Sequence, residues 1–409
     1  MNSLRIASRL HFSKKLLPIF SRSVADSSIG SVRSMSNSNI DRSKLEIVRN
    51  TSPKEKTPYE DLQFGVTFSD HMLEIDWDEK TGWSNPIIKP YGDFAMSPAA
   101  SCLHYGIECF EGMKAYKDTD GNIRMFRPDC NMERMNFSMN RLCLPGFNGA
   151  ELTECIKELL KIDESWIPTK DGYSMYIRPT AIGTADYLGV TKSNKCKIFV
   201  ILSPVGPYYK SGFKPVKLLA NTEDVRAWPG GVGNAKLGGN YGPTIAPATN
   251  AISEGCDQIL WLFGEDHTIT EVGAMNIFFV FKTLDGKTEL VTAPLGRGDI
   301  LPGVTRRSII EMTKEWSKSN DGKHSDLIVN ERFVTMGEVK QASDEGRLLE
   351  AFGAGTAVVI APVKGIKYKN EDINIPTGEE AGPLAQEIWT SLTDIQYGRK
   401  DHPSWSIKI

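Results

Sequence analysis

The chain contains the stretch Trp228-Pro-Gly-Gly-Val-Gly-Asn-Ala-Lys-Leu-Gly-Gly-Asn-Tyr-Gly242, in which six of the fifteen residues are glycine. Glycine loses more conformational freedom on folding than any other residue, so this density needs a physical reason. The backbone here either adopts dihedral angles that other residues avoid or approaches a ligand closely. A plain surface loop is the competing interpretation, although such loops are more often rich in Ser and Asp. A nucleotide P-loop is excluded because the pattern GxxxxGK[ST] is absent.

The composition of the whole chain is that of a globular protein. Of its 409 residues, 40% are hydrophobic and 24% are charged, which is typical of soluble domains. At roughly 100–200 residues per domain, this length predicts two or three domains. No apolar run approaches the roughly 20 residues that a membrane-spanning helix needs. We therefore expect no membrane partner.

The first 36 residues differ from the rest of the chain. They contain six basic residues, ten serines and a single acidic residue, Asp26. Between positions 4 and 20, apolar residues alternate with basic ones. An amphipathic start rich in Arg and Ser and poor in acids is typical of an organellar transit peptide. We therefore predict a transit peptide at 1–36 and a location in the mitochondrial matrix, with a disordered tail on a cytoplasmic protein as the alternative.

The charge and the cysteines restrict the partners and the compartment further. Without residues 1–36 the chain has 42 basic and 50 acidic residues, a net charge of −8, which argues against a nucleic-acid partner. Its seven cysteines include no CxxC pair and are odd in number, so no disulfide framework is expected. A reducing compartment fits this pattern. The six histidines show no metal-ligand spacing, so no metal site is predicted.

The apolar periodicity predicts a mixture of strands and helices without an internal repeat. Strands are expected at 66–68, 72–77, 87–91, 112–116, 123–126, 174–179, 196–203, 216–220, 258–263, 275–281, 289–292 and 357–362. Helices are expected at 131–141, 152–162, 243–254 and 305–318. Pairs of strands that resemble hairpins outnumber regular βαβ units. The predicted fold class is therefore α+β.

Changes in composition divide the chain into segments. Residues 37–58 are polar and charged and predict a flexible lead-in. Gly and Pro cluster at 204–215, which favours an inter-domain loop there. A small domain is therefore expected at 59–203 and a larger one at 216–409.

Lys236-Leu-Gly-Gly-Asn-Tyr241 resembles the cofactor-lysine region of fold-type IV enzymes that use pyridoxal 5′-phosphate (PLP), specifically the branched-chain amino-acid aminotransferases. Six further motifs resemble this family in the family's own order, and the resemblance extends from about Phe64 to Gly398. These motifs are His104-Tyr-Gly-Ile-Glu-Cys-Phe-Glu-Gly-Met-Lys-Ala-Tyr116, Phe126-Arg-Pro with Asn131-Met-Glu-Arg134, Tyr176-Ile-Arg-Pro179, Glu271-Val-Gly-Ala-Met-Asn276, Leu301-Pro-Gly-Val-Thr-Arg306 and Phe352-Gly-Ala-Gly-Thr-Ala357. The pattern is closest to the mitochondrial and cytosolic eukaryotic enzymes.

This resemblance implies a fold, a cofactor and a reaction. The fold would be a two-domain fold-type IV PLP enzyme with a small N-terminal α/β domain and a larger C-terminal pseudo-barrel domain. The cofactor would be pyridoxal 5′-phosphate. The reaction would move the amino group of L-leucine, L-isoleucine or L-valine to 2-oxoglutarate, giving branched-chain 2-oxo acids and L-glutamate.

Transamination requires a primary amine that forms an imine with PLP, is displaced by the substrate and then carries a proton between two carbons. The resemblance assigns this role to Lys236, although without the motif a solvated lysine would be preferred. A carboxylate beside the pyridine nitrogen of PLP favours its protonated form, and Glu271 matches the family's residue there. Tyr241 matches the tyrosine that binds the phenolic oxygen, with a packed aromatic as the alternative.

The cofactor phosphate needs cations and backbone amides. Val304 and Thr305 lie at a predicted helix N-terminus, where free N–H groups and the helix dipole favour an anion. The residues alone are equally compatible with an ordinary helix start capped by Thr305. The resemblance implies a phosphate site here with Arg134 and Thr356 as further ligands, and it implies that the Ala357 N–H binds the substrate carboxylate.

Substrate specificity is expected from an apolar pocket with few polar groups. Arg178 lies two residues after Tyr176 and therefore on the same strand face, where the resemblance places the side-chain carboxylate of glutamate. A structural arginine is the competing interpretation, and each aromatic residue taken singly is more often core than pocket. The resemblance implies a pocket formed by Phe64, Tyr176, Tyr208 and Ala274, with Tyr105 and Val190 contributed by a second subunit. A homodimer is therefore expected.

The sequence departs from the family in two places. Val358 and Ala361 occupy the positions of a redox-sensitive CxxC in related animal enzymes, so no thiol regulation is expected there. Ala274 stands where some relatives have threonine, which removes one polar contact from the expected pocket.

Two other functions remain compatible with parts of the sequence. Another fold-type IV enzyme, such as a D-amino-acid aminotransferase or an aminodeoxychorismate lyase, would share the lysine region. A non-catalytic protein that binds phosphate or nucleotide through the glycine-rich loop would bind no chromophore.

Overall fold

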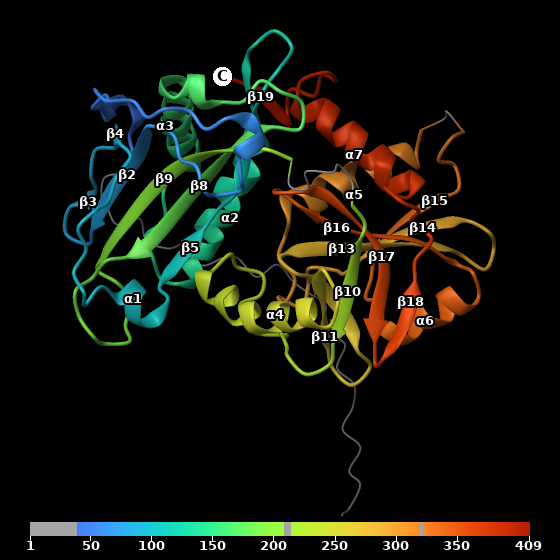
Figure 1. Cartoon of the computed structure of the whole chain (residues 1–409). Helices are drawn as coiled ribbons and strands as arrows, with labels where there is room; N and C mark the ends of the chain where they lie inside the picture. Colours follow the sequence, from blue (N-terminus) through green and yellow to red (C-terminus); the bar gives the residue numbers. More distant parts are fainter. Residues whose placement is uncertain (1–38, 208–213, 320–321) are drawn as a thin grey trace, which may run out of the picture. The chain divides into compact units, whose positions relative to one another are not determined.

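The computed structural model describes residues 39–207, 214–319 and 322–409. The predicted transit peptide, residues 1–36, lies outside the described residues, and so does Tyr208. Two large sheets with their covering helices make up the described part of the chain (Figure 1).

The first sheet has ten strands, and all of its pairings are antiparallel except that of β1 with β4. Its main path runs β1-β4-β2-β9-β8-β6-β7-β19, with β3 beside β2 and β5 beside β8. The strands are β1 (Glu46–Ile47), β2 (His71–Asp78), β3 (Gly82–Trp83), β4 (Ile87–Pro90), β5 (Glu108–Phe110), β6 (Met113–Lys117), β7 (Ile123–Phe126), β8 (Ser174–Gly183), β9 (Lys195–Val205) and β19 (Ser406–Lys408).

Two long helices cover the first sheet, α2 (Pro128–Arg141) and α3 (Gly149–Ile162), and a short helix, α1 (Ser101–Tyr105), follows β4. In α3, Leu152, Ile156 and Leu159 are fully buried. Their spacing of four and three residues places them on one helical face. That face packs against β2, and this core holds the first sheet rigid beside the cavity described below.

The second sheet has nine strands, and the pairing of β12 with both β11 and β13 closes β12, β11, β10, β17, β16 and β13 into a ring. The strands are β10 (Val216–Asn221), β11 (Gln258–Phe263), β12 (Thr268–Val272), β13 (Met275–Lys282), β14 (Thr288–Thr292), β15 (Leu327–Glu331), β16 (Leu348–Gly355), β17 (Val359–Tyr368) and β18 (Glu371–Asn374). The ring corresponds to the predicted pseudo-barrel.

Strand β13 is buried on both faces, which explains why its sequence is apolar throughout. Ile277 and Phe279 belong to the core inside the ring, whereas Phe278 and Val280 pack outside it against α5 and α7. Successive side chains of a strand point to opposite faces, so a strand covered on both faces is apolar throughout. The helices that follow the barrel strands are α4 (Ile245–Ser253), α5 (Val304–Trp316), α6 (Met336–Asp344) and α7 (Pro383–Gln396).

Most predicted elements are confirmed with shifted ends, but one is wrong. No strand forms at 66–68: Val66 lies in a turn with Gly65, whose φ of 71° belongs to the left-handed region, and residues 67 and 68 belong to neither a helix nor a strand. The strand expected at 357–362 begins only at Val359, since Thr356, Ala357 and Val358 form a turn. That turn is part of the candidate site.

The sequence did not predict β12, β16, α6 or α7. The segment Leu348–Gly355 contains two alanines and two glycines, which have low strand propensity. It forms a strand because β13 and β17 pair with it on both sides. Tertiary pairing therefore overrides local preference there.

The segment boundaries predicted from composition stay predictions. Within 37–58 the described residues include β1 and a buried Ile40. Strand β9 continues to Val205, inside the expected inter-domain loop at 204–215. The chain returns to the first sheet at its end, because β19 pairs with β7.

Candidate active site

A cavity of about 350 Å³ is lined by residues from both sheets. All seven residues that the sequence assigns to the cofactor line it, namely Lys236, Arg134, Tyr241, Glu271, Val304, Thr305 and Thr356. Of the residues assigned to substrate, Phe64, Tyr176, Arg178, Ala274 and Ala357 line it as well. Residues that are distant in sequence therefore share one cavity.

Lys236 lies in the loop before the 3₁₀ helix Gly238–Asn240. Its backbone N–H donates to Ser138 Oγ at 2.8 Å and its carbonyl accepts from Phe110 N–H at 3.1 Å. Its Nζ donates to Tyr241 Oη at 3.0 Å and lies 4.7 Å from the centre of the Phe110 ring. No carboxylate among the described residues forms an ion pair with this amine. The loop thus presents a primary amine without an acidic partner to the cavity.

The glycines around Lys236 allow close packing. A Cβ on Gly238 would overlap the carboxylate of Glu108, the first residue of β5. A Cβ on Gly233 would lie 2.5 Å from Ala227 Cβ and 2.6 Å from Asp299 O. At Gly233, where the Cβ would meet backbone atoms of Asp299, only glycine lets the backbone come this close. The loop is fixed against its neighbours, which holds the lysine in place.

Glu271, on β12, is buried at one end of the cavity and is only half satisfied. Its Oε1 accepts from Leu301 N–H at 3.0 Å and from the Asn276 amide at 3.1 Å. Its Oε2 lies 2.5 Å from Arg226 Nη1, but the two groups are not aligned for a hydrogen bond, and neither atom has another partner. Burial raises the pKa of Glu271, which Arg226 partly opposes. Oε2 is therefore ion-paired with Arg226 but accepts no well-aligned hydrogen bond, and an N–H group placed beside it would be stabilised.

Arg134, on α2, is held by a second buried glutamate, Glu111. Its Nε and Nη2 donate to the two carboxylate oxygens at 2.7 and 2.9 Å, and its Nη1 donates to Pro302 O at 3.0 Å. Burial alone would raise the pKa of Glu111, but the Arg134 guanidinium keeps this pKa below its usual range. Arg134 is therefore a fixed cation in the cavity wall.

Two backbone turns contribute amides to the cavity. Helix α5 begins at Val304 after Gly303, and no side chain caps this end, so the first N–H groups lack intrahelical acceptors. A Cβ on Gly303 would overlap the Asn276 side chain, so glycine is needed there. Between β16 and β17, Thr356 and Ala357 form the other turn. Free amides and a helix dipole make this end of the cavity suited to anions.

Tyr176 and Arg178 of β8 lie on the same face, as the sequence predicts. The Arg178 Nη2 donates to Tyr176 Oη at 3.1 Å, and its guanidinium lies 4.7 Å from the centre of the Phe110 ring. Its Nε is buried without a hydrogen-bond partner. Phe64 contacts the Tyr176 ring edge-on at 4.8 Å between ring centres. This part of the cavity joins an aromatic wall to a cation that retains a free donor.

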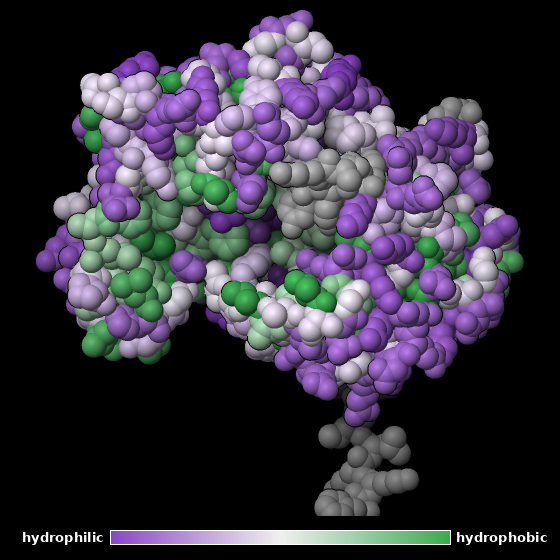
Figure 2. Space-filling model, in the orientation of Figure 1, coloured by the Kyte–Doolittle hydropathy of each residue, from purple (hydrophilic) through white to green (hydrophobic). Residues whose placement is uncertain are grey.

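Tyr105 and Val190 do not line this cavity. The Tyr105 hydroxyl donates to Leu188 O at 2.7 Å, and Leu188 and Val190 are 65% and 83% exposed. Hydrophobic surface gathers near α1 and over α4 (Figure 2), where Ile245 is also exposed. Exposed apolar patches of this kind mark interaction surfaces.

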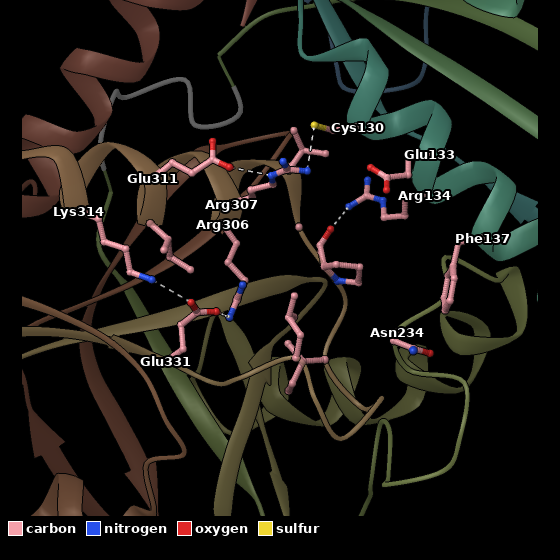
Figure 3. A pocket seen from close by; sticks show the side chains of 16 residues that line it. Cys130, Glu133, Arg134, Phe137, Asn234, Arg306, Arg307, Glu311, Lys314 and Glu331 are labelled. Carbon is pink, nitrogen blue, oxygen red and sulfur yellow. Dashed lines mark hydrogen bonds and ion pairs between the residues drawn. The ribbon is translucent and has the colours of Figure 1, made fainter. Parts of the chain in front are cut away.

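A second cavity, of about 630 Å³, shares Arg134, Gly303 and Val304 with the first (Figure 3). Here Arg306 Nη2 lies 2.8 Å from Glu331, which Lys314 also contacts at 3.2 Å. The remaining cations pair as well, Arg307 with Glu311 and Arg134 with Glu111. Since every cationic side chain of its described lining has an acidic partner, this cavity lacks the free amine of the first.

Sequence reasoning missed Phe110, Glu111, Arg226 and Asn276. Glu111 lies inside a motif of the resemblance, yet nothing local indicates that it pairs with Arg134. Arg226 precedes the glycine-rich loop and meets Glu271 only through the barrel. These contacts join segments distant in sequence, so spacing does not reveal them.

Candidate metal sites and membrane-spanning helices are both absent from the described residues. Within 39–207, 214–319 and 322–409 no group of three or more His, Cys, Asp or Glu side chains could hold a metal ion. In the same part of the chain no helix is both long enough and apolar enough to span a membrane.

The chain is similar to known proteins of one family. The model of the amino-transferase class IV family matches residues 108–366. The chain is 51% identical over 366 residues to the branched-chain-amino-acid aminotransferase of Monosiga brevicollis, covering 89% of this chain and 92% of that protein. It is 50% identical over 370 residues to the mitochondrial branched-chain-amino-acid aminotransferase of Saccharomyces cerevisiae, covering 90% and 93%. The cytosolic enzyme of Mus musculus is 49% identical over 366 residues, covering 89% and 92%.

Solved structures give the same result at lower identity. The branched-chain amino acid aminotransferase of T.th., solved with pyridoxamine 5′-phosphate, superposes with a TM-score of 0.62 at 26% identity, covering 81% of this chain and 97% of that chain. The corresponding enzyme of Escherichia coli has a TM-score of 0.63 at 22% identity, covering 81% and 98%. The second likeness concerns the fold alone.

Proposed function

The chain belongs to the class IV aminotransferase family, and from this membership we propose that it transfers the amino group of L-leucine, L-isoleucine and L-valine to 2-oxoglutarate. The predicted family and the α+β fold-type IV class are confirmed. The products would be branched-chain 2-oxo acids and L-glutamate. The observation that carries this proposal is the Lys236 amine, without an acidic partner, in a cavity with a buried carboxylate and free amides.

The residues of the cavity fit pyridoxal 5′-phosphate as the cofactor. The buried Glu271 Oε2 is ion-paired with Arg226 but accepts no hydrogen bond, and a protonated pyridine nitrogen could donate one. Arg134, the start of α5 at Val304 and Thr305, and Thr356 would hold the phosphate. Tyr241 would bind the phenolic oxygen. The bound cofactor supplies a carbonyl carbon and a ring that accepts electrons.

Lys236 would act twice in the reaction. Its Nζ would be the nucleophile that attaches the cofactor, and the same amine would then carry the proton that leaves the substrate Cα. The Tyr241 hydroxyl, 3.0 Å from Nζ, keeps the amine directed into the cavity. The Phe110 ring covers one side of the amine and excludes water there.

Specificity would come from the wall formed by Phe64, Tyr176 and Arg178. The aromatic rings accept an aliphatic side chain by apolar contact. The unpartnered Nε of Arg178 accounts for the second substrate, since it can donate to the side-chain carboxylate of glutamate. The Ala357 N–H would bind the α-carboxylate of either substrate. One cavity would then serve both halves of the reaction.

We also propose a homodimer in the mitochondrial matrix. The exposed apolar residues Tyr105, Leu188 and Val190 support a second subunit on this surface, which would complete the pocket as the resemblance implies. The mitochondrial assignment rests on the composition of residues 1–36.

Reconstitution with pyridoxal 5′-phosphate tests the proposal. The wild-type protein should turn yellow, and borohydride should fix the chromophore on Lys236. Lys236→Ala should bind no stable chromophore and transaminate no amino acid. The exposed Lys364→Met is the matched control and should behave as wild type.

Two results would count against the proposal. Protein that stays colourless with the cofactor would favour a non-catalytic phosphate-binding role. Yellow protein that prefers D-alanine to L-leucine as the amino donor would instead identify a different activity within the same fold.

A further inference from the structure

Lys114 of β6 is a buried lysine to which the proposed reaction assigns no role. Its side chain is 8% exposed, and no carboxylate among the described residues pairs with it. Its Nζ donates to Ala357 O at 2.8 Å. A buried ammonium group without an acidic partner is costly, so its presence at this position requires an explanation.

The turn that Lys114 contacts separates two cavities. Ala357 and Val358 line both the 350 Å³ cavity and another of about 260 Å³, and Lys114 lines only the latter. Ala357 O and the Val358 N–H belong to one planar trans peptide, so they point in opposite directions. Lys114 holds the Ala357 carbonyl on the side of the 260 Å³ cavity. The Val358 N–H is therefore directed towards the 350 Å³ cavity, which is the candidate site.

A small cavity connects Lys114 with the anion-binding end of the site. It has a volume of about 20 Å³ and is lined by Lys114, Thr305, Thr356 and Gln396, among others. The Gln396 Oε1 is buried without a hydrogen-bond partner. A space of roughly 10–15 Å³ with two to four polar partners is enough for one water molecule. One water here would join Lys114 to Gln396 and to the two threonines.

We propose that Lys114 is a positioning residue of the candidate site: its ammonium group fixes the turn at Ala357 from behind and supplies the positive charge that favours anions bound at Thr305 and Thr356. The inference rests on the proposed function in taking these anions to be the cofactor phosphate and the substrate carboxylate. Unlike the proposed function, the inference also predicts how the cofactor-free protein binds inorganic phosphate.

Burial lowers the pKa of Lys114 to about 8, and no charged group contributes to this shift. The titratable groups that face its surroundings are Tyr116 on its own strand, Tyr176 opposite it on β8, and Tyr397, Asp171 and Arg399 around the adjoining cavity. An anion bound in front of the turn would raise this pKa. Binding would then favour the charged lysine and weaken as the pH rises above about 8.

The test compares Lys114→Met with Lys114→Arg in the full chain freed of cofactor. Calorimetric titration with inorganic phosphate should show binding about tenfold or more weaker in Lys114→Met, because the turn loses the charge-assisted hydrogen bond to Ala357 O and the positive charge behind the anion. Lys114→Arg should restore most of the affinity. Lys364→Met, which removes an exposed lysine of β17, should leave it unchanged.

The pH series separates Lys114 from other titrating groups. Between pH 7 and 9 the wild-type affinity for phosphate should fall more steeply than that of Lys114→Met, and the difference belongs to Lys114. A thermal scan controls for folding, since replacing an unpaired buried charge by Met should not lower Tm.

The possible results lead to separate conclusions. Lys114→Met that keeps wild-type phosphate affinity, or wild-type protein that binds no phosphate, would overturn the inference. A lower Tm with unchanged affinity would assign Lys114 a structural role only. Wild-type protein that binds phosphate but neither turns yellow nor transaminates leucine would refute the proposed function and leave the result for Lys114 standing.

Discussion

Two glutamates, Glu111 and Glu271, are buried at the candidate site, and each lies against an arginine. Both oxygens of Glu111 accept hydrogen bonds from Arg134, and Asn131 adds a further donor to one of them. In Glu271 one oxygen is bonded and the other has no hydrogen-bond partner, although Arg226 lies beside it. The same two residue types thus form one closed pair and one open pair.

The difference separates a structural role from a functional one. Guanidinium donors keep the pKa of Glu111 low despite its burial, whereas burial raises the pKa of Glu271 because too few donors compensate for it. A buried polar atom without a partner is destabilising in isolation. It is tolerated where a ligand will complete it, which is the place we propose for the cofactor ring.

Breaking the closed pair, Glu111 with Arg134, should have the largest effect on stability. Glu111→Gln should lower the free energy of unfolding by about 3–5 kcal/mol, because it leaves the Arg134 charge buried and uncompensated. Urea denaturation measures this. The double variant Glu111→Gln/Arg134→Met removes both charges and should recover most of the stability while losing phosphate affinity. A single variant within about 1 kcal/mol of wild type would show that the pair is not structural.

Breaking the Glu271–Arg226 pair should mainly reduce the rate of catalysis. Glu271→Gln should reduce kcat by about 10²–10³-fold, the usual loss when one preorganised electrostatic contact is removed. The free energy of unfolding should fall less than in Glu111→Gln: the variant leaves the buried Arg226 charge without its carboxylate, but it also removes a carboxylate whose pKa burial has raised. Single-turnover kinetics with leucine measures the first effect. The exposed Glu254→Gln is the control, and an active Glu271→Gln enzyme would contradict the assignment.

Lowering the pH should change the contribution of the two carboxyl groups to stability in opposite directions. The pKa of Glu111 is lowered from its ordinary value of 4.5, so its contribution to stability is complete above pH 4.5 and is lost as the pH falls through the lower, folded-state pKa. The pKa of Glu271 is raised, so its cost disappears as the pH falls.

Thermal unfolding measured from pH 7 to pH 3 tests this difference. The fall in Tm with acid should be smaller in Glu111→Gln than in wild type and no smaller in Glu271→Gln. Identical profiles for both variants would mean that the two carboxyls titrate alike.

The smallest expected effect comes from the loop that follows Glu271. Ala274→Thr adds a hydroxyl to the cavity wall, and a neutral hydrogen bond contributes about 0.5–1.5 kcal/mol. KM for leucine should therefore fall by up to about tenfold with little change in Tm. A large loss of kcat would show that the hydroxyl disturbs the open pair instead of extending the pocket.

Local patterns were sufficient for much of the fold. Helix α3 and strand β13 have clear apolar periodicity or a continuous apolar run, and both were predicted near their observed positions. Strand β16 was not predicted, because its alanines and glycines become a strand only between β13 and β17. Residues 66–68 were predicted as a strand from their side chains alone, but Val66 lies in a turn with Gly65, which has a positive φ, and residues 67 and 68 join no strand.

The candidate site divides in the same way. Its cofactor residues were predicted from short motifs and share one cavity. Phe110, Arg226 and Lys114 were not predicted, because each acts on a residue far away in the chain. Tyr105 and Val190 remain a proposal that depends on a second subunit.

Lys236 within its glycine-rich loop, the α+β class and the family follow from the sequence by itself, because local backbone requirements and motif order are properties of the chain. Which buried carboxylate is closed by its arginine and which remains open was decided only by the tertiary structure. Hydrogen-bond completion depends on the relative placement of β12, α2 and the loops around them, and that placement results from the packing of the whole chain.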